Sequence, residues 1–141
     1  MDHIVYTDAK SKELDRILDG TKSMIIRGAA GRKLPHGRVF EKDILYFMRN
    51  NGEGRVLARA VVSDVFNSEK MEKHESIEIV EANQEKLQLD QKQLKKWAGK
   101  RYLVLIKIKS IELIDEFEID RSEYNNMDDW LPVEDINSVR K

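Results

Sequence analysis

The stretch Gly20–Arg38, GTKSMIIRGAAGRKLPHGR, joins a short apolar segment to a glycine-rich basic loop. Glycine has no Cβ, so a loop rich in it can bend sharply or bring its backbone close to a ligand. The stretch contains no carboxylate, and its basic side chains are Lys22, Arg27, Arg32, Lys33, His36 and Arg38. A loop of this kind suits a phosphate, or a base together with its backbone.

The bulk composition predicts one ordinary intracellular domain. The chain has 141 residues and a mass of 16.5 kDa, which is the size of a single domain. It has no cysteine, which fits a reducing compartment. No apolar run approaches the ~20 residues of a membrane helix, and the first ten residues do not resemble a signal peptide. We therefore expect a cytoplasmic protein without a membrane partner.

The net charge of −1 hides a strong segregation of charge along the chain. Residues 22–55 carry eight Lys/Arg against three acids, and residues 91–111 carry seven Lys/Arg and no acid. Residues 112–135, in contrast, carry ten acids and one Arg. Two basic blocks that meet in the fold would form a nucleic-acid-binding surface on a nearly neutral protein. Alternatively, basic and acidic blocks simply pair with one another.

The first half of the chain predicts strands around one short helix. We expect a strand at 3–6, then a helix that contains Leu14, Ile17 and Leu18, is capped by Thr7 or Asp8 and ends at Gly20. Strands follow at 23–27 and 43–48. Asn51-Gly52 then indicates a hairpin into a long strand over 55–66, in which alternate residues are apolar.

The second half predicts one more helix and one long strand. We expect a loop at 67–75, a short edge strand at 76–80, a helix at 90–98 and a strand at 102–114. The apolar face of this last strand changes parity at Lys109-Ser110, which predicts a β-bulge there. Five to six mostly antiparallel strands with two or three short helices favour a small α+β barrel. Residues 1–115 would form the barrel, and residues 116–141 would be an acidic extension docked on it through Trp130–Val133.

Common catalytic and metal-binding motifs do not fit this sequence. The segment Gly28–Lys33 is neither a P-loop nor a GxGxxG motif, because its glycine spacing is wrong and no Ser/Thr follows the lysine. The three histidines are scattered and form no metal-binding pair. No residue has the setting of a serine nucleophile. We therefore predict no metal and no cofactor.

The segment Gly20–Arg27, read as Gly-x-Lys-x-x-x-x-Arg, resembles the ASCH domain of the PUA-like superfamily. The order of elements around it and the later stretch LKKWAGKRYLVLIKIK at 94–109 are similar to that family too. The resemblance covers residues 3–114. It implies a small β-barrel with a cleft lined by the Gly-x-Lys segment and used to bind RNA.

One bacterial branch of the family removes the acetyl group from acetylated cytidine, with the pattern Gly-x-Lys-Thr-x-Thr-x-Arg. The resemblance places its lysine at Lys22. Ile25 stands where the second Thr of the catalytic set belongs, so that hydroxyl is missing. The later Glu of the set would fall near Leu87, and Glu85 is the nearest candidate.

The first hypothesis is an RNA- or nucleotide-binding domain. Lys22 would be the central cation of the cleft, and Arg27, five residues along the same strand, would face the opposite side. Other contacts, largely with phosphate, would come from Arg27, Arg32, Lys33, His36, Arg38, Lys95, Lys96 and Lys107. Trp97 and Trp130 are aromatic rings on which a base could stack. A solvated surface for the cations and a core position for the rings are the competing interpretations.

The second hypothesis is an enzyme, either a hydrolase of a modified nucleoside or a ribonuclease. Lys22 would be the base or an electrostatic stabiliser, and Glu85 or His36 would carry the proton. An enzyme of this type requires a carboxylate or His close to Lys22 in a closed pocket, whereas a binding domain requires an open groove. A third hypothesis is a protein-interaction domain that uses the acidic tail, and the tail could also cover the basic cleft.

Overall fold

A computed structural model of the chain describes residues 1–120 and 129–141. The described residues form six strands, namely β1 (Asp2–Thr7), β2 (Met24–Ala29), β3 (Ile44–Arg49), β4 (Arg55–Asn67), β5 (Tyr102–Glu118) and β6 (Trp130–Glu134). The α-helices are α1 (Glu13–Leu18), α2 (Lys73–Ala82), α3 (Gln84–Leu87) and α4 (Gln91–Trp97), and a 3₁₀ turn, η1, spans Ile136–Ser138.

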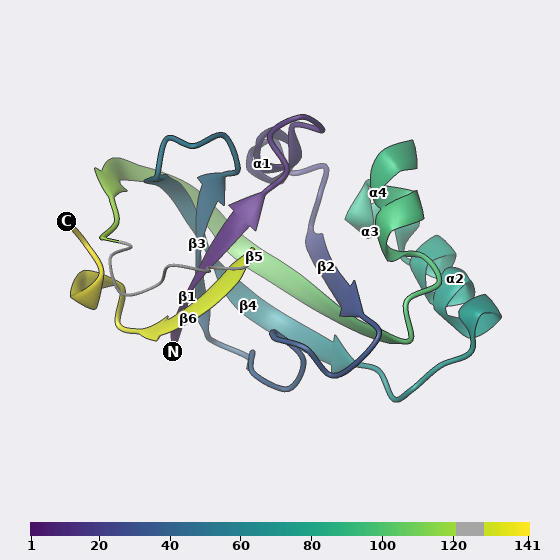
Figure 1. Ribbon diagram of the computed structural model, residues 1–141. Coiled ribbons are helices and arrows are strands. Elements are labelled where there is room, and N and C mark those ends of the chain that lie inside the picture. The colour runs from purple at the N-terminus through teal and green to yellow at the C-terminus, as the bar shows by residue number, and fades with distance from the viewer. Residues whose placement is uncertain (121–128) are drawn as a thin grey trace.

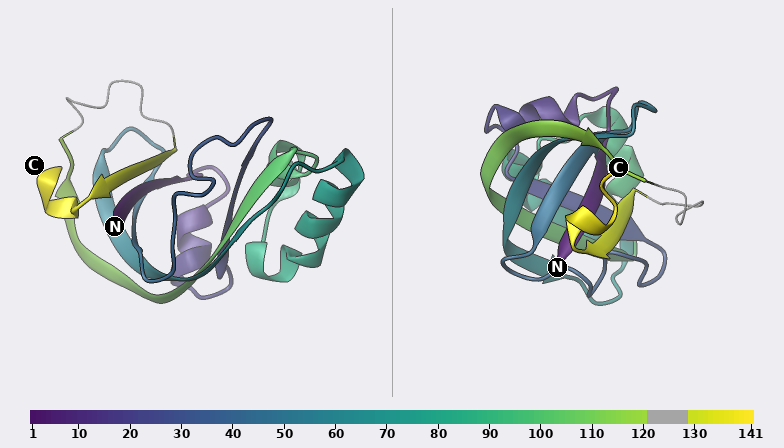
Figure 2. Two further views of the ribbon diagram at one scale, coloured as in Figure 1. Left: turned by 90° about the horizontal axis from the view of Figure 1, so that it is seen from below. Right: turned by 90° about the vertical axis from the view of Figure 1, so that its left-hand side faces the viewer.

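The strands form one mixed sheet in the order β2-β5-β4-β3-β1-β6, which curls into a half-barrel (Figure 1). Neighbouring strands are antiparallel except β1 and β3, which run parallel with Ile4 opposite Tyr46. Helices α2, α3 and α4 gather at one end of the sheet, and the C-terminus lies at the other end (Figures 1 and 2). The predicted barrel is confirmed, with four α-helices where two or three were expected.

The main core fills the concave side of the sheet. Alternate residues of β4 (Val56, Ala58, Ala60 and Val62) are completely buried, as a half-buried strand requires. Leu14 and Ile17 of α1 pack into the same core as Ile25 and Ile106. Helix α1 therefore packs inside the curl of the sheet and holds the start of β2 in place.

Helix α1 begins differently from the prediction. Its N-cap residue is Lys12, in a left-handed conformation and without a capping side-chain hydrogen bond. The predicted caps have other partners: the Asp8 carboxylate accepts the backbone N–H groups of Lys10 and Ser11, and the Thr7 hydroxyl donates to the carbonyl of Met48. Asp8 thus shapes the turn before the helix, because its side chain bonds the backbone two and three residues on.

The segment 76–80, expected to be an edge strand, is part of helix α2. The alternation of Ile77, Ile79 and polar residues suggested a strand, but a capping box between Glu72 and Glu75 starts a helix just before it. Ser76 and Val80, four residues apart, are the buried positions of that helix. The short helix α3 and the strand β6 were not predicted as such.

Strand β5 changes direction where the sequence indicated a bulge. Ser110 has a φ of 53°, and the pairing register with β4 shifts next to it. Past the bulge the apolar residues Ile111 and Leu113 were expected to share one buried face. This is wrong in part, because Leu113 is 70% exposed. The strand extends to Glu118, beyond residue 115, and β6 lies in the same sheet next to β1.

Candidate functional site

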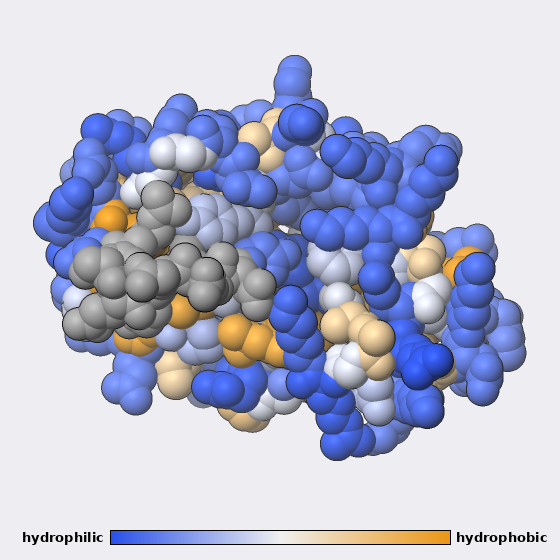
Figure 3. Space-filling view, viewed as in Figure 1, coloured by the Kyte–Doolittle hydropathy of each residue, from blue (hydrophilic) through white to orange (hydrophobic). Residues whose placement is uncertain are grey.

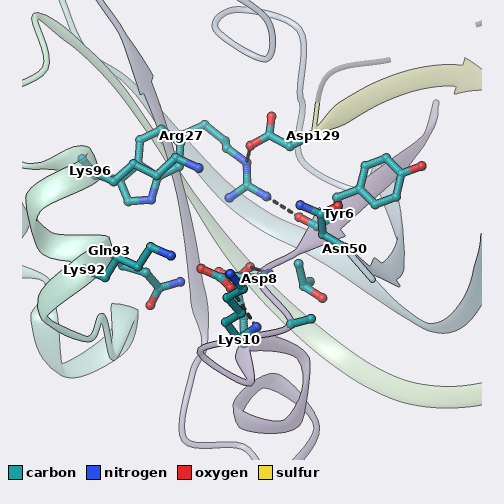
Figure 4. A pocket seen from close by; sticks show the side chains of 13 residues that line it. Tyr6, Asp8, Lys10, Arg27, Asn50, Lys92, Gln93, Lys96 and Asp129 are labelled. Atoms are coloured by element: carbon teal, nitrogen blue, oxygen red, sulfur yellow. Dashed lines mark hydrogen bonds and ion pairs between the residues drawn. The ribbon is translucent and has the colours of Figure 1, made fainter. Parts of the chain in front are cut away.

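A polar pocket with a volume of about 290 Å³ opens between helix α4, the start of α1 and the end of β1. Figure 4 shows Lys92, Gln93 and Lys96 on the α4 side, with Asp8 and Arg27 among the residues across from them. We call this pocket the α4 cleft, and its lining residues are Tyr6, Thr7, Asp8, Ala9, Lys10, Glu13, Arg27, Asn50, Lys92, Gln93, Lys96, Trp97 and Asp129. Most of the molecular surface on the face drawn in Figure 3 is hydrophilic.

An ion pair of two buried residues lies at the floor of the α4 cleft. The Glu13 carboxylate lines the cleft although only 5% of the residue is exposed. Its Oε1 accepts the backbone N–H of Asp8, and its Oε2 lies 3.6 Å from the Nζ of Lys22. Lys22 is 1% exposed and does not line the cleft, so Glu13 separates its ammonium from any ligand there.

Helices from two parts of the chain fix the position of Lys22. Its Nζ donates to the carbonyl of Leu87 at the end of α3, at 2.5 Å. Its backbone N–H donates to the carbonyl of Arg16 in α1. The pKa of Lys22 is lowered to about 8, mainly by burial and in part by the charges of Arg27 and Arg16, while Glu13 opposes the change.

The strand alternation that predicted opposite faces for Lys22 and Arg27 does not extend to Lys22. Lys22 precedes β2, which begins at Met24, so its direction is set by its own contacts.

Arg27 joins three parts of the chain at the wall of the cleft. Its guanidinium donates to the carbonyls of Ile26 and Tyr6, and its Nε lies 2.9 Å from the Oδ2 of Asp129. The guanidinium carbon also lies 5.8 Å from the ring centre of Trp97 and 5.6 Å from that of Trp130. Arg27 is 5% exposed, and this network suits a structural clamp better than a phosphate contact.

Three lysines surround the opening of the cleft and are exposed to solvent, namely Lys10, Lys92 and Lys96. The Nζ of Lys96 lies 4.7 Å from the ring centre of Trp97, which itself lines the cleft. The cleft therefore combines a buried carboxylate, a buried guanidinium, an aromatic ring and exposed lysines.

The basic loop does not contribute to the α4 cleft. Arg32, Lys33 and Arg38 are exposed, and Arg32 lies 3.5 Å from the carboxylate of Glu69. The His36 ring contacts the carbonyl of Ser68 and the edge of Tyr102. Of the predicted cationic contacts, Arg27 and Lys96 line the cleft, as does the predicted stacking ring of Trp97, and Lys22 lies behind it.

The remaining predicted residues are dispersed. Glu85 is exposed on α3, whose last residue, Leu87, contacts Lys22 through its backbone. Lys95 points to solvent, and Lys107 lines a separate groove beside α2. Ile25 is buried in the main core and does not line the cleft. The carboxylate near Lys22 is therefore that of Glu13, not of Glu85 as predicted.

Clusters of potential metal ligands and membrane-spanning helices are not found in the described part of the chain. Residues 1–120 and 129–141 contain no group of three or more His, Cys, Asp or Glu side chains that could hold a metal ion. None of the described helices is both long and apolar enough to cross a membrane.

Comparison with known proteins identifies the fold. The crystal structure of an ASCH protein from Zymomonas mobilis superimposes with a TM-score of 0.66 and 12% identity, over 99% of this chain and 96% of that one. A point mutant of that protein gives a TM-score of 0.68 at 10% identity over 99% of both chains. A second point mutant gives a TM-score of 0.67 at 10% identity, over 94% of this chain and 87% of that one. This chain has the ASCH fold.

The resemblance noted at Gly20–Arg27 is thus confirmed at the level of the fold. No model of a known protein family matches the sequence, and no curated protein matches it either. The structural match covers 99% of this chain. An identity of 10–12% carries no site residue across, so the chemistry must be argued from this chain.

Sequence reasoning missed several residues of the α4 cleft. The apolar spacing of the first helix gives no role to Glu13, which is the first residue of that helix and pairs with Lys22. Asp8, Lys10 and Asn50 come from turns whose positions depend on the fold. The pattern of lysines at 92, 95 and 96 was the available signal, because Lys92 and Lys96 are four residues apart and share one helix face.

Proposed function

We propose that this ASCH-fold protein binds a nucleotide in the α4 cleft, either free or as one residue of a single-stranded RNA. The arrangement of three lysines around a pocket with an aromatic wall carries the proposal. Phosphate would lie at the opening, near Lys10, Lys92 and Lys96, because ammonium groups attract it there. The base would enter the cleft next to Trp97, since aromatic rings stack on any base.

The size of the cleft favours one nucleotide. Its volume of about 290 Å³ is close to the lower end of small-molecule sites, at about 300 Å³. In a longer RNA, neighbouring phosphates would extend to the exposed cations Arg32, Lys33 and Arg38 of the basic loop. These residues are proposed as secondary contacts outside the cleft.

A salt series tests this assignment. Binding of a short single-stranded RNA is measured for the wild type, for Lys92→Ala/Lys96→Ala and for Lys95→Ala. Lys95 is the matched control, because it lies on the same helix and does not line the cleft. The double variant is expected to bind more weakly, with a log–log salt slope shallower by about 1.4, while Lys95→Ala stays close to wild type. Equal slopes for the three proteins would contradict binding in the cleft.

The loop is tested by Arg32→Ala/Lys33→Ala in the same assay. For a single nucleotide this variant should bind as tightly as the wild type. For a longer RNA it should bind more weakly. A loss of single-nucleotide binding in the loop variant would move the primary site from the cleft to the loop.

A second candidate function, hydrolysis of a modified nucleoside or of RNA, is favoured by the Lys22–Glu13 pair. A lysine whose pKa is about 8 next to a carboxylate at the floor of a pocket is a usual arrangement for proton transfer. Water added across an amide of an N-acylated base would give the free amine and a carboxylic acid. Mass spectrometry of N-acylated nucleosides and short RNAs incubated with wild type and Glu13→Gln tests it. Product formed by the wild type but not by the variant would support this function.

A further inference from the structure

The α4 cleft combines a buried carboxylate with exposed cations. Glu13 is buried, whereas Lys10, Lys92 and Lys96 are exposed, and the guanidinium of the buried Arg27 already donates to two backbone carbonyls. Burial alone would raise the pKa of Asp8, but hydrogen bonds from Ser11 and Lys10 and the charge of Lys92 outweigh it and lower that pKa. A ligand that fits these charges has its anionic end near the exposed lysines and a hydrogen-bond donor facing Glu13.

The Glu13 carboxylate is held in one position. The Asp8 N–H binds one of its oxygens at 3.1 Å, and the Lys22 ammonium lies behind the other at 3.6 Å. An ionised carboxylate only accepts hydrogen bonds, and each oxygen can accept more than one. Any ligand group that meets Glu13 must therefore be a donor, because a carbonyl oxygen placed there would be repelled.

Nucleobases differ in this respect. Adenine, cytosine and guanine each carry an exocyclic amino group, whereas uracil carries two carbonyls on either side of a single imide N–H. From the geometry of the cleft we infer that Glu13 determines the specificity of the site. It accepts a hydrogen bond from the exocyclic amino group of the bound base, so that amino-bearing nucleotides bind in preference to uridine nucleotides. This inference rests on the proposed nucleotide-binding function.

The test compares AMP, CMP, GMP and UMP by calorimetric titration of the wild type, Glu13→Gln and Glu85→Gln. For the wild type, at least one amino-bearing nucleotide should bind about tenfold or more tightly than UMP, as expected for a hydrogen bond to a charged group. In Glu13→Gln this ratio should fall towards one, because the amide presents a donor as well as an acceptor. The Glu85→Gln control, exposed on α3, should keep the wild-type ratio.

The ratio between nucleotides separates specificity from structural damage, which would lower all four affinities together. If Glu13→Gln does not fold, because it leaves Lys22 buried without its partner, Glu13→Gln/Lys22→Met removes both members of the pair and gives the same prediction. UMP binding as tightly as the other nucleotides, or a preference that survives in the folded variant, would overturn the inference and leave the binding function intact. No binding of any nucleotide would instead overturn the proposed function.

Discussion

The buried Lys22 ammonium should make the stability of the protein depend on pH in the alkaline range. Its pKa is lowered from 10.5 to about 8 in the folded state, mainly by burial. Below about pH 8 both the folded and the unfolded chain carry the proton, and the folded state bears the full penalty, about 3 kcal/mol. Between about pH 8 and 10.5 the unfolded state binds more protons, so the free energy of unfolding should rise with pH.

The measurement is denaturant unfolding of the wild type and of Lys22→Met/Glu13→Gln at about pH 7 and about pH 10. The double variant lacks both members of the pair, so the difference between the two proteins isolates their titration. The wild type should gain about 2 kcal/mol relative to the variant over this range. A difference that stays constant within about 0.5 kcal/mol, a typical error of such comparisons, would refute the argument that Lys22 is desolvated.

Three further predictions concern the structure around the cleft. Arg27→Met should lower the free energy of unfolding by roughly 2 kcal/mol or more in denaturant titrations, because two backbone carbonyls lose their hydrogen-bond donor and Asp129 loses its ion-pair partner. Gly28→Ala should cost roughly 1–3 kcal/mol, because its Cβ would lie 2.8 Å from a leucine side-chain carbon and 3.0 Å from a carbonyl oxygen of β5. In Gly31→Ala the added Cβ has no neighbour within 4 Å, so the free energy of unfolding should stay within about 0.5 kcal/mol of the wild type. Equal losses of stability in the two glycine variants would contradict this reasoning. Burial lowers the pKa of His3 below 6.5, so the unfolded chain takes up a proton before the folded chain does as the pH is lowered. The melting temperature should therefore decrease when the pH is lowered below about 6.5. His3→Gln should flatten this decline, whereas the exposed control His74→Gln should not; a decline that is identical in both variants would exclude His3 as its source.

Much of the fold could be predicted from local patterns. Three local patterns predicted what the structure has: a strand from the alternation in 55–66, a turn at Asn51-Gly52 and a bulge at Ser110. Each of them depends only on residues that are neighbours in the sequence. Helix α2 could not be predicted in this way, because its residues also alternate and the capping box at Glu72 decides between the two structures. Strand β6 depends on pairing with β1 more than a hundred residues earlier, which no local pattern shows.

The candidate site was less predictable than the fold. Lys22 was recognised from its motif, but its carboxylate partner was sought at Glu85 and lies at Glu13, since the packing of α1 against the sheet decides this contact. Several of the predicted ligand contacts lie in the glycine-rich loop, because its basic residues are close together in the sequence. In the α4 cleft the cations come from two separate segments, and only the tertiary structure brings Lys10 near Lys92 and Lys96.

The proposed function depends on ligand binding in the α4 cleft and not primarily at the basic loop. Titration of the ¹⁵N-labelled protein with single nucleotides, followed by NMR, tests this directly, because amide shifts report which residues contact the ligand. The largest shifts are expected at residues 6–10, at Asn50 and at residues 92–97, which line or adjoin the cleft. Shifts confined to residues 30–38, with the cleft unchanged, would contradict it.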